Sequence, residues 1–124
     1  MHEGTLTEDL FEHVLAHARD ANALRVTHVK VTIGALSDAT IESIQFYWDN
    51  LAPGTIAEGA LLEFDTAPGT ARCSTCGEEF TIEERFAVCP NCGAFPVKVT
   101  GGEGVYLASL EVETAGEQHE HIHK

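Results

Sequence analysis

The sequence has few positive charges. Seven Lys and Arg residues stand against 20 Asp and Glu residues, which gives a formal net charge of −13. Affinity for nucleic acid depends on neutralising phosphates with Lys and Arg, so this composition argues against a nucleic-acid partner. The acidity suits cations and basic protein partners, although a solvated acidic surface is also common in globular proteins.

Other absences exclude further classes. No apolar run approaches the ~20 residues of a membrane span, and no charged, then apolar, then small-residue signal opens the chain. We therefore expect a cytoplasmic protein that does not enter the membrane. The phosphate loop G-x-x-x-x-G-K-S/T and the nucleophile elbow G-x-S-x-G are both absent. Because the sequence shows no group of residues in a known catalytic pattern, it predicts a protein that is not an enzyme.

Cysteine is scarce but concentrated. All four cysteines form two C-x2-C pairs, Cys73 with Cys76 and Cys89 with Cys92, separated by twelve residues. Two such turns can place four thiolates about 2.3 Å from one tetrahedral ion. Disulfides, a redox C-x-x-C motif and a rubredoxin-like iron site are the alternatives, but the spacing favours zinc. Because a four-cysteine shell leaves no open coordination position, we expect this zinc to be structural.

The loop between the two pairs is too polar to form a core. Its apolar residues are few: Phe80, Ile82, Phe86 and Val88. We therefore expect the metal to supply the folding energy of a small zinc ribbon. Gly77 and Gly93 follow the two pairs, where a tight turn favours a residue with positive φ.

The remaining pattern predicts helices and strands. An apolar stripe at helical spacing indicates a helix up to about residue 21, with a capping box at Thr5 and Glu8. A second helix should follow an N-cap at Ser37 and end before Pro53. Alternation predicts strands at 24–33 and 105–113, with Val26 on the face of His28 and with Tyr106 and Ala108 on the face of Leu110. A short apolar segment predicts a further strand at 61–66.

Together these elements predict an α+β fold. We expect a small mixed β-sheet with two helices on one face, plus a four-cysteine zinc ribbon inserted between two neighbouring strands. The predicted division is an α/β domain at 1–70 and 103–113, a zinc-ribbon domain at 71–102, and a flexible tail at 114–124.

Two groups of histidines have spacings that suit metal binding. His13 and His17 lie four residues apart, so they share one helix face. The tail alternates His119, His121 and His123, a pattern that can bind soft divalent metals. Solvated polar positions are the alternative for the first group, and a disordered chain end is the alternative for the second.

The combined motifs resemble one family. Met1-His2-Glu3 at the start, an amphipathic helix, a Val-rich strand ending at Gly34, the stretch PGTIAEGALL at 53–62 and the pair CSTCG…CPNCG are similar to the HypA family of hydrogenase-maturation nickel chaperones. The resemblance covers about residues 1–113. The tail is not part of the family pattern.

The resemblance implies a function. It implies that Ni(II) is bound and delivered to the large subunit of a NiFe hydrogenase, with Zn(II) held by Cys73, Cys76, Cys89 and Cys92. It also implies work alongside the nickel GTPase HypB and, in some organisms, alongside urease accessory proteins. We expect a monomer or a weak homodimer.

The first residues are suited to nickel in their own right. The Met1 amine, the His2 amide nitrogen and the His2 imidazole can form fused chelate rings around one ion, and Glu3 adds an amide or carboxylate donor. Square-planar nitrogen ligation suits Ni(II) or Cu(II) rather than zinc. Two competing hypotheses are a zinc-ribbon adaptor that transfers no metal and a rubredoxin-like electron carrier.

Overall fold

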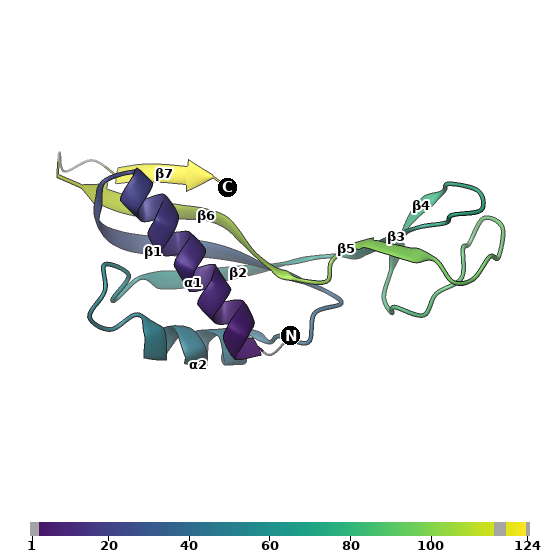
Figure 1. Ribbon diagram of the computed structural model, residues 1–124, viewed down its shortest axis with the longest axis horizontal. Helices are drawn as coiled ribbons and strands as arrows, with labels where there is room; N and C mark the ends of the chain where they lie inside the picture. The colour runs from purple at the N-terminus through teal and green to yellow at the C-terminus, as the bar shows by residue number, and fades with distance from the viewer. Residues whose placement is uncertain (1–2, 116–118, 124) are drawn as a thin grey trace.

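The computed structural model describes residues 3–115 and 119–123 (Figure 1). Within these residues no helix is long and apolar enough to cross a membrane. The elements, in chain order, are α1 (Glu3–Asp20), β1 (Ala23–Gly34), α2 (Ile41–Leu51), β2 (Leu61–Ala67), β3 (Gly69–Arg72), β4 (Glu79–Ile82), β5 (Lys98–Gly101), β6 (Val105–Thr114) and β7 (His119–His123).

The helix α1 buries the predicted apolar stripe but begins earlier than predicted. Leu10, Phe11, Val14 and Ala18 are buried. The capping box at Thr5 and Glu8 is wrong, because α1 already begins at Glu3. The Phe11 ring packs edge-on against α2, with its centroid 5.1 Å from that of Trp48. This contact joins the two helices into one layer.

The helix α2 has its N-cap at Thr40 and not at Ser37. The Thr40 hydroxyl accepts a hydrogen bond from the Ser43 amide, and the Ser43 hydroxyl accepts one from the Thr40 amide, each at 3.1 Å. The Ser37 hydroxyl instead accepts from the Ala39 amide. As predicted, the helix ends before Pro53, at Leu51.

The first sheet is mixed and has the order β2-β1-β6-β7. Strand β1 lies in its interior, parallel to β2 and antiparallel to β6. Buried residues of α1, α2, β1 and β6 form one core cluster, so both helices cover the same face. This confirms the predicted α+β architecture.

The pairing of β1 with β6 shifts register at three places, and the shifts at Thr27 and Ala108 change which of the predicted residues face the core. Val26 pairs with Val112 and His28 pairs with Glu111, which leaves Thr27 without a partner in the register. Such a bulge reverses the alternation of the strand, so Val26 is buried and does not share the face of His28.

The second bulge lies on β6. Lys30 pairs with Ser109 and Val31 pairs with Leu107, which leaves Ala108 unpaired. Leu107 is therefore buried, whereas Tyr106 is exposed. The prediction that Tyr106 and Ala108 share the face of Leu110 is wrong for this reason.

The second sheet has the order β4-β3-β5 and extends away from the first (Figure 1). The chain enters it after β2 and returns through β6, and both of these strands flank β1. The inserted ribbon is thus confirmed, but the strands on either side of it are not neighbours of each other. The domain boundaries at 71 and 102 stay a prediction.

The flexible tail at 114–124 stays a prediction, although the structure describes strands within this segment. Strand β6 continues to Thr114, and His119–His123 form β7, antiparallel to β6. An exposed strand edge favours the addition of another strand, because its backbone groups need partners.

The two sheets meet at a close backbone contact. The Leu36 amide donates to the Gly102 carbonyl at 2.8 Å, and the Gly34 amide donates to the Gly104 carbonyl at 2.7 Å. A Cβ added to Gly34 would lie 2.3 Å from the Gly102 carbonyl carbon and oxygen. No side chain fits there without moving the junction.

We predict that Gly34→Ala destabilises the fold. Overpacking of this kind costs about 1–3 kcal/mol of the free energy of unfolding, measurable by urea denaturation. The matched control is Gly4→Ala in α1, where the added Cβ would meet only the Tyr47 ring at 3.3 Å. Because alanine favours helix, the control should be neutral or stabilising. Equal stability of Gly34→Ala and the parent would contradict the tight junction.

Candidate metal centres

Each C-x2-C pair lies in a turn closed by two backbone hydrogen bonds. In the first turn, the Gly77 amide donates to the Cys73 carbonyl at 2.8 Å, and the Cys73 amide donates to the Glu78 carbonyl at 2.9 Å. The second turn repeats both bonds at the equivalent positions, Cys89, Gly93 and Ala94. The two glycines both have φ of 77°, which confirms why glycine follows each pair.

The two turns bring the four sulfur atoms together. The Sγ atoms of Cys73 and Cys92 are 3.6 Å apart, as are those of Cys76 and Cys89. All four lie within 4.8 Å of one another. A disulfide needs about 2.05 Å, whereas thiolates about 2.3 Å from one tetrahedral ion are about 3.8 Å apart. The cluster therefore fits a metal ion.

Hydrogen-bond donors near the sulfur atoms of Cys73 and Cys76 favour metal binding by these cysteines. An amide hydrogen bond from Cys76 lowers the pKa of Cys73 to about 6. The Asn91 side chain, 3.6 Å from the Cys76 sulfur, lowers the pKa of Cys76. The Ala94 amide acts to lower the pKa of Cys92, but the Cys73 sulfur and burial outweigh it and raise that pKa to about 12. A cation that shares the charge would favour loss of the proton from the Cys92 thiol.

The four sulfur donors fit a structural zinc ion better than a metal ion with a catalytic role. Four sulfur donors complete a tetrahedral shell, which is the usual structural zinc site and leaves no position for a substrate. Cys73 and Cys89 are buried, whereas Cys76 and Cys92 are exposed. The protein therefore covers one side of the cluster, and the other side faces solvent.

The candidate nickel ligands are only partly within the structure. Met1 and His2 lie outside the described residues, and Glu3 is the first residue of α1. The next residue, Gly4, lies against α2, since a Cβ there would be 3.3 Å from the Tyr47 ring. The predicted donors therefore precede α1 in the sequence or belong to its first residue, and the first turn of this helix packs against α2. The set of nickel ligands stays a prediction.

The pair His13 and His17 lies on α1, as expected. His13 is exposed and borders a hollow of about 280 Å³ between α1 and β6, together with Asp9 and Tyr106. His17 is half-buried. Metal binding by this pair stays a hypothesis, and two solvated polar positions stay the alternative.

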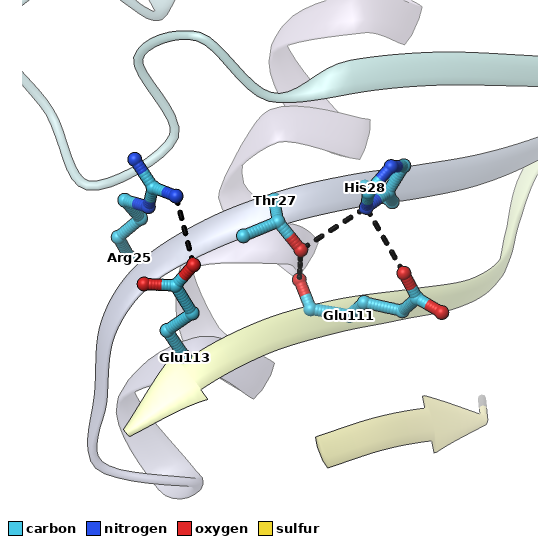
Figure 2. Close-up of polar contacts among 5 residues, drawn as sticks. All are labelled: Arg25, Thr27, His28, Glu111 and Glu113. Atoms are coloured by element: carbon cyan, nitrogen blue, oxygen red, sulfur yellow. Dashed lines mark hydrogen bonds and ion pairs between the residues drawn. The ribbon is translucent and has the colours of Figure 1, made fainter. Parts of the chain in front are cut away.

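Sequence reasoning missed one polar cluster, on the face of the first sheet opposite the helices (Figure 2). His28 Nδ1 lies 2.9 Å from Glu111 Oε2, and Arg25 forms an ion pair with Glu113 at 2.8 Å. The alternation of Glu111 and Glu113 with buried Leu110 and Val112 was the signal in the sequence. The sequence did not predict their partners on β1, because the bulge at Thr27 changes which β1 residues lie on the same face as these glutamates.

Comparisons with known proteins give a consistent result. The family model described as "HypA: Hydrogenase/urease nickel incorporation, metallochaperone, hypA" matches residues 1–112. The chain is 41% identical over 113 residues to the hydrogenase maturation factor HypA of Methylocella silvestris, which covers 91% of this chain and 100% of that protein. It is 34% identical over 139 residues to HypA of Pyrococcus horikoshii, with coverage of 95% and 100%.

A solved structure agrees in fold. The solution structure of the Ni metallochaperone HypA from Helicobacter pylori superposes with a TM-score of 0.78 at 23% sequence identity, covering 92% of this chain and 99% of that chain.

We predict that Cys73→Ala releases the metal and unfolds the second sheet. Metal binding in comparable small sites contributes on the order of 10 kcal/mol of folding energy. The first sheet should survive, because its core cluster is separate. Elemental analysis and amide NMR spectra measure both effects, and Ser74→Ala, an exposed position between the two cysteines of the first pair, is the control. One retained zinc with an unchanged spectrum in Cys73→Ala would refute the site.

Proposed function

Because the chain belongs to the HypA family of hydrogenase/urease nickel-incorporation metallochaperones, we propose that it binds Ni(II) at its N-terminus and delivers the ion to the large subunit of a NiFe hydrogenase. The observation that carries this proposal is the family match, which runs from residue 1 through both cysteine pairs to residue 112. Family membership confirms the predicted resemblance. It also makes the chain a maturation factor and not an enzyme.

The proposed nickel ligands are the Met1 amine, the His2 backbone nitrogen and imidazole, and a donor from Glu3. Donors on adjacent residues close small chelate rings, so little chain entropy is lost on binding. Nitrogen donors in this arrangement suit Ni(II). A ligand set at the end of the chain also leaves the ion open to a receiving protein, as a carrier requires.

The proposed role of Zn(II) is structural. The second sheet has a small core. Its apolar cluster, among the described residues, consists of buried Leu36, Ala71 and Ile82 and of partly buried Phe80, Ala87, Val97 and Val99. A metal at Cys73, Cys76, Cys89 and Cys92 would join the two turns and add the missing folding energy. The closed shell supports a separation between a metal that stays and a metal that is transferred.

The proposed partners follow from the same assignment. They are the nickel GTPase HypB, the hydrogenase large subunit and, where urease is served, urease accessory proteins, all met in the cytoplasm. Along α1 the side chains of Glu8, Asp9 and Glu12 are exposed. This acidic surface belongs to the helix that follows the proposed nickel ligands in the sequence, so we propose that HypB docks on it.

We predict that His2→Ala abolishes N-terminal nickel binding without affecting zinc or the fold. The reason is the loss of the imidazole, and a Gly-Ser extension before Met1 should act in the same way by removing the amine. Calorimetric titration with Ni(II) measures the effect in zinc-loaded protein. His119, His121 and His123 are replaced by Gln in every sample so that the tail does not mask the loss.

His17→Gln tests the alternative site on α1 in the same titration, and it should bind nickel as the parent does because the proposed ligands lie at Met1, His2 and Glu3. Undiminished affinity in His2→Ala would disprove the N-terminal site. If the parent binds zinc but no nickel at all, the zinc-ribbon adaptor becomes the better hypothesis.

We also predict that the purified chain hydrolyses no GTP.

A further prediction concerns the docking surface: replacing Glu8, Asp9 and Glu12 by Lys should weaken HypB binding at least tenfold. Binding is measured by calorimetry, and the control reverses the exposed residues Glu78, Glu79 and Glu83 of the second sheet. Equal HypB affinity for the two triple variants would exclude α1 as the docking surface.

A further inference from the structure

The second sheet leaves large apolar side chains exposed in the segment that follows β4. Phe86 is 83% exposed and Val88 is 58% exposed. Neither is part of the apolar cluster of this sheet, whose buried members are Leu36, Ala71 and Ile82. Contact with water disfavours such exposure, and exposed apolar side chains that gather in one place mark binding surfaces.

Both side chains border the same hollow, which has a volume of about 320 Å³. It is lined by residues of β4 and of the segment that leads to Cys89. The apolar part of the lining includes Phe80, Phe86, Val88 and Pro90. The exposed apolar side chains are therefore gathered around one hollow that can receive a bulky apolar group.

The charged residues of the hollow have one sign. Glu83 and Glu84 line it, and both are exposed. In the part of the chain that the structure describes, neither carboxylate forms an ion pair. Arg85 is the one Lys or Arg in the sequence from β4 to Pro90, and it pairs with Glu103 at the junction of the two sheets. The hollow therefore offers unpaired negative charge to a partner.

The neighbouring strand suits an extended partner. Strand β4 is an edge strand, since the sheet order β4-β3-β5 gives it a neighbour on one side. It lies at the end of the molecule that is far from α1 and α2, so neither helix covers it (Figure 1). An edge strand of this kind can accept an extended segment as an additional strand.

We propose that this hollow binds an extended segment of a partner protein, in which Lys or Arg residues flank a large apolar side chain. The apolar side chain would pack against Phe86 and Val88, and the flanking cations would pair with Glu83 and Glu84. An anchor in a pocket supplies much of the affinity of such an interface, whereas complementary charge speeds association and disfavours wrong partners. The surface contains none of the proposed nickel ligands, so the inference does not depend on the proposed function.

The charge and the topology disfavour two other occupants. A second copy of this chain carries the same formal net charge of −13, so the two copies repel each other. The C-terminal strand β7 of the chain itself pairs with β6 of the first sheet. A basic segment of another protein meets neither obstacle.

The test uses the full, zinc-loaded chain and a short labelled peptide in which Lys and Leu alternate, with binding measured by fluorescence anisotropy. Peptides with Ser in place of Leu, or Glu in place of Lys, should bind at least tenfold more weakly, because they lack the apolar anchors or the positive charge. Absence of binding by the Lys–Leu peptide would overturn the proposal. So would equal binding of the Lys–Leu and Lys–Ser peptides, since the apolar side chains would then contribute nothing.

One variant tests the apolar part of the surface. Phe86→Ser should weaken binding of the Lys–Leu peptide at least tenfold, because the anchor loses its main contact. The matched control is Phe46→Ser in α2, an aromatic residue that is 63% exposed on the first part of the molecule, and it should bind as the parent does. Equal affinity of the two variants would overturn the proposal.

A second variant tests the charge. Glu83→Gln combined with Glu84→Gln should weaken binding of the Lys–Leu peptide, and the loss should shrink as salt is added. Glu8→Gln combined with Glu12→Gln removes the same charge from exposed positions of α1 and should have a smaller effect. An equal or larger effect of the α1 variant would contradict binding at the hollow.

Two measurements guard against misfolding and against a second copy as the occupant. In the parent, which needs no substitution, the peptide should shift the amide NMR signals of β4, Phe86 and Val88, and shifts confined to α1 would overturn the proposal. Sedimentation without peptide should give the same mass for the parent and for Phe86→Ser. A parent dimer that Phe86→Ser dissociates would overturn the assignment to a partner protein.

Discussion

The second sheet depends on one electrostatic constraint, which is that four thiolates can share a small space only around a cation. The four Sγ atoms lie within 4.8 Å of one another, and the pKa of Cys92 rises to about 12 because its neighbouring sulfur and burial oppose a further negative charge. The apolar core of this sheet is small. A metal ion bound there would therefore be both the electrostatic partner of the thiolates and the main link between the two turns.

The first sheet is stabilised by a larger apolar core, so the stability of the two sheets rests on different interactions. Its core joins both helices to β1 and β6, with Phe11 and Trp48 in contact across the helix layer. This core is separate from that of the second sheet, which carries the cysteines. An ion at the proposed N-terminal site would then be gained and lost without disturbing the second sheet, which is the property that a carrier needs.

Local sequence patterns predicted much of this structure. The spacing of Cys73, Cys76, Cys89 and Cys92 predicted the metal cluster, since each turn is built from adjacent residues. The patterns did not predict the bulges at Thr27 and Ala108, because a bulge is defined by the pairing of two distant strands. For the same reason the contact between His28 and Glu111 was missed. The caps were misplaced because serine and threonine recur near each helix start, and packing decides which one is used.

The central claim is that this chain carries nickel at its N-terminus and passes it on. The most direct test mixes nickel-loaded protein with the metal-free precursor of the hydrogenase large subunit and measures the nickel in the separated subunit. We expect transfer from the parent and little transfer from a chain with a Gly-Ser extension before Met1. Equal transfer from both proteins would contradict the claim.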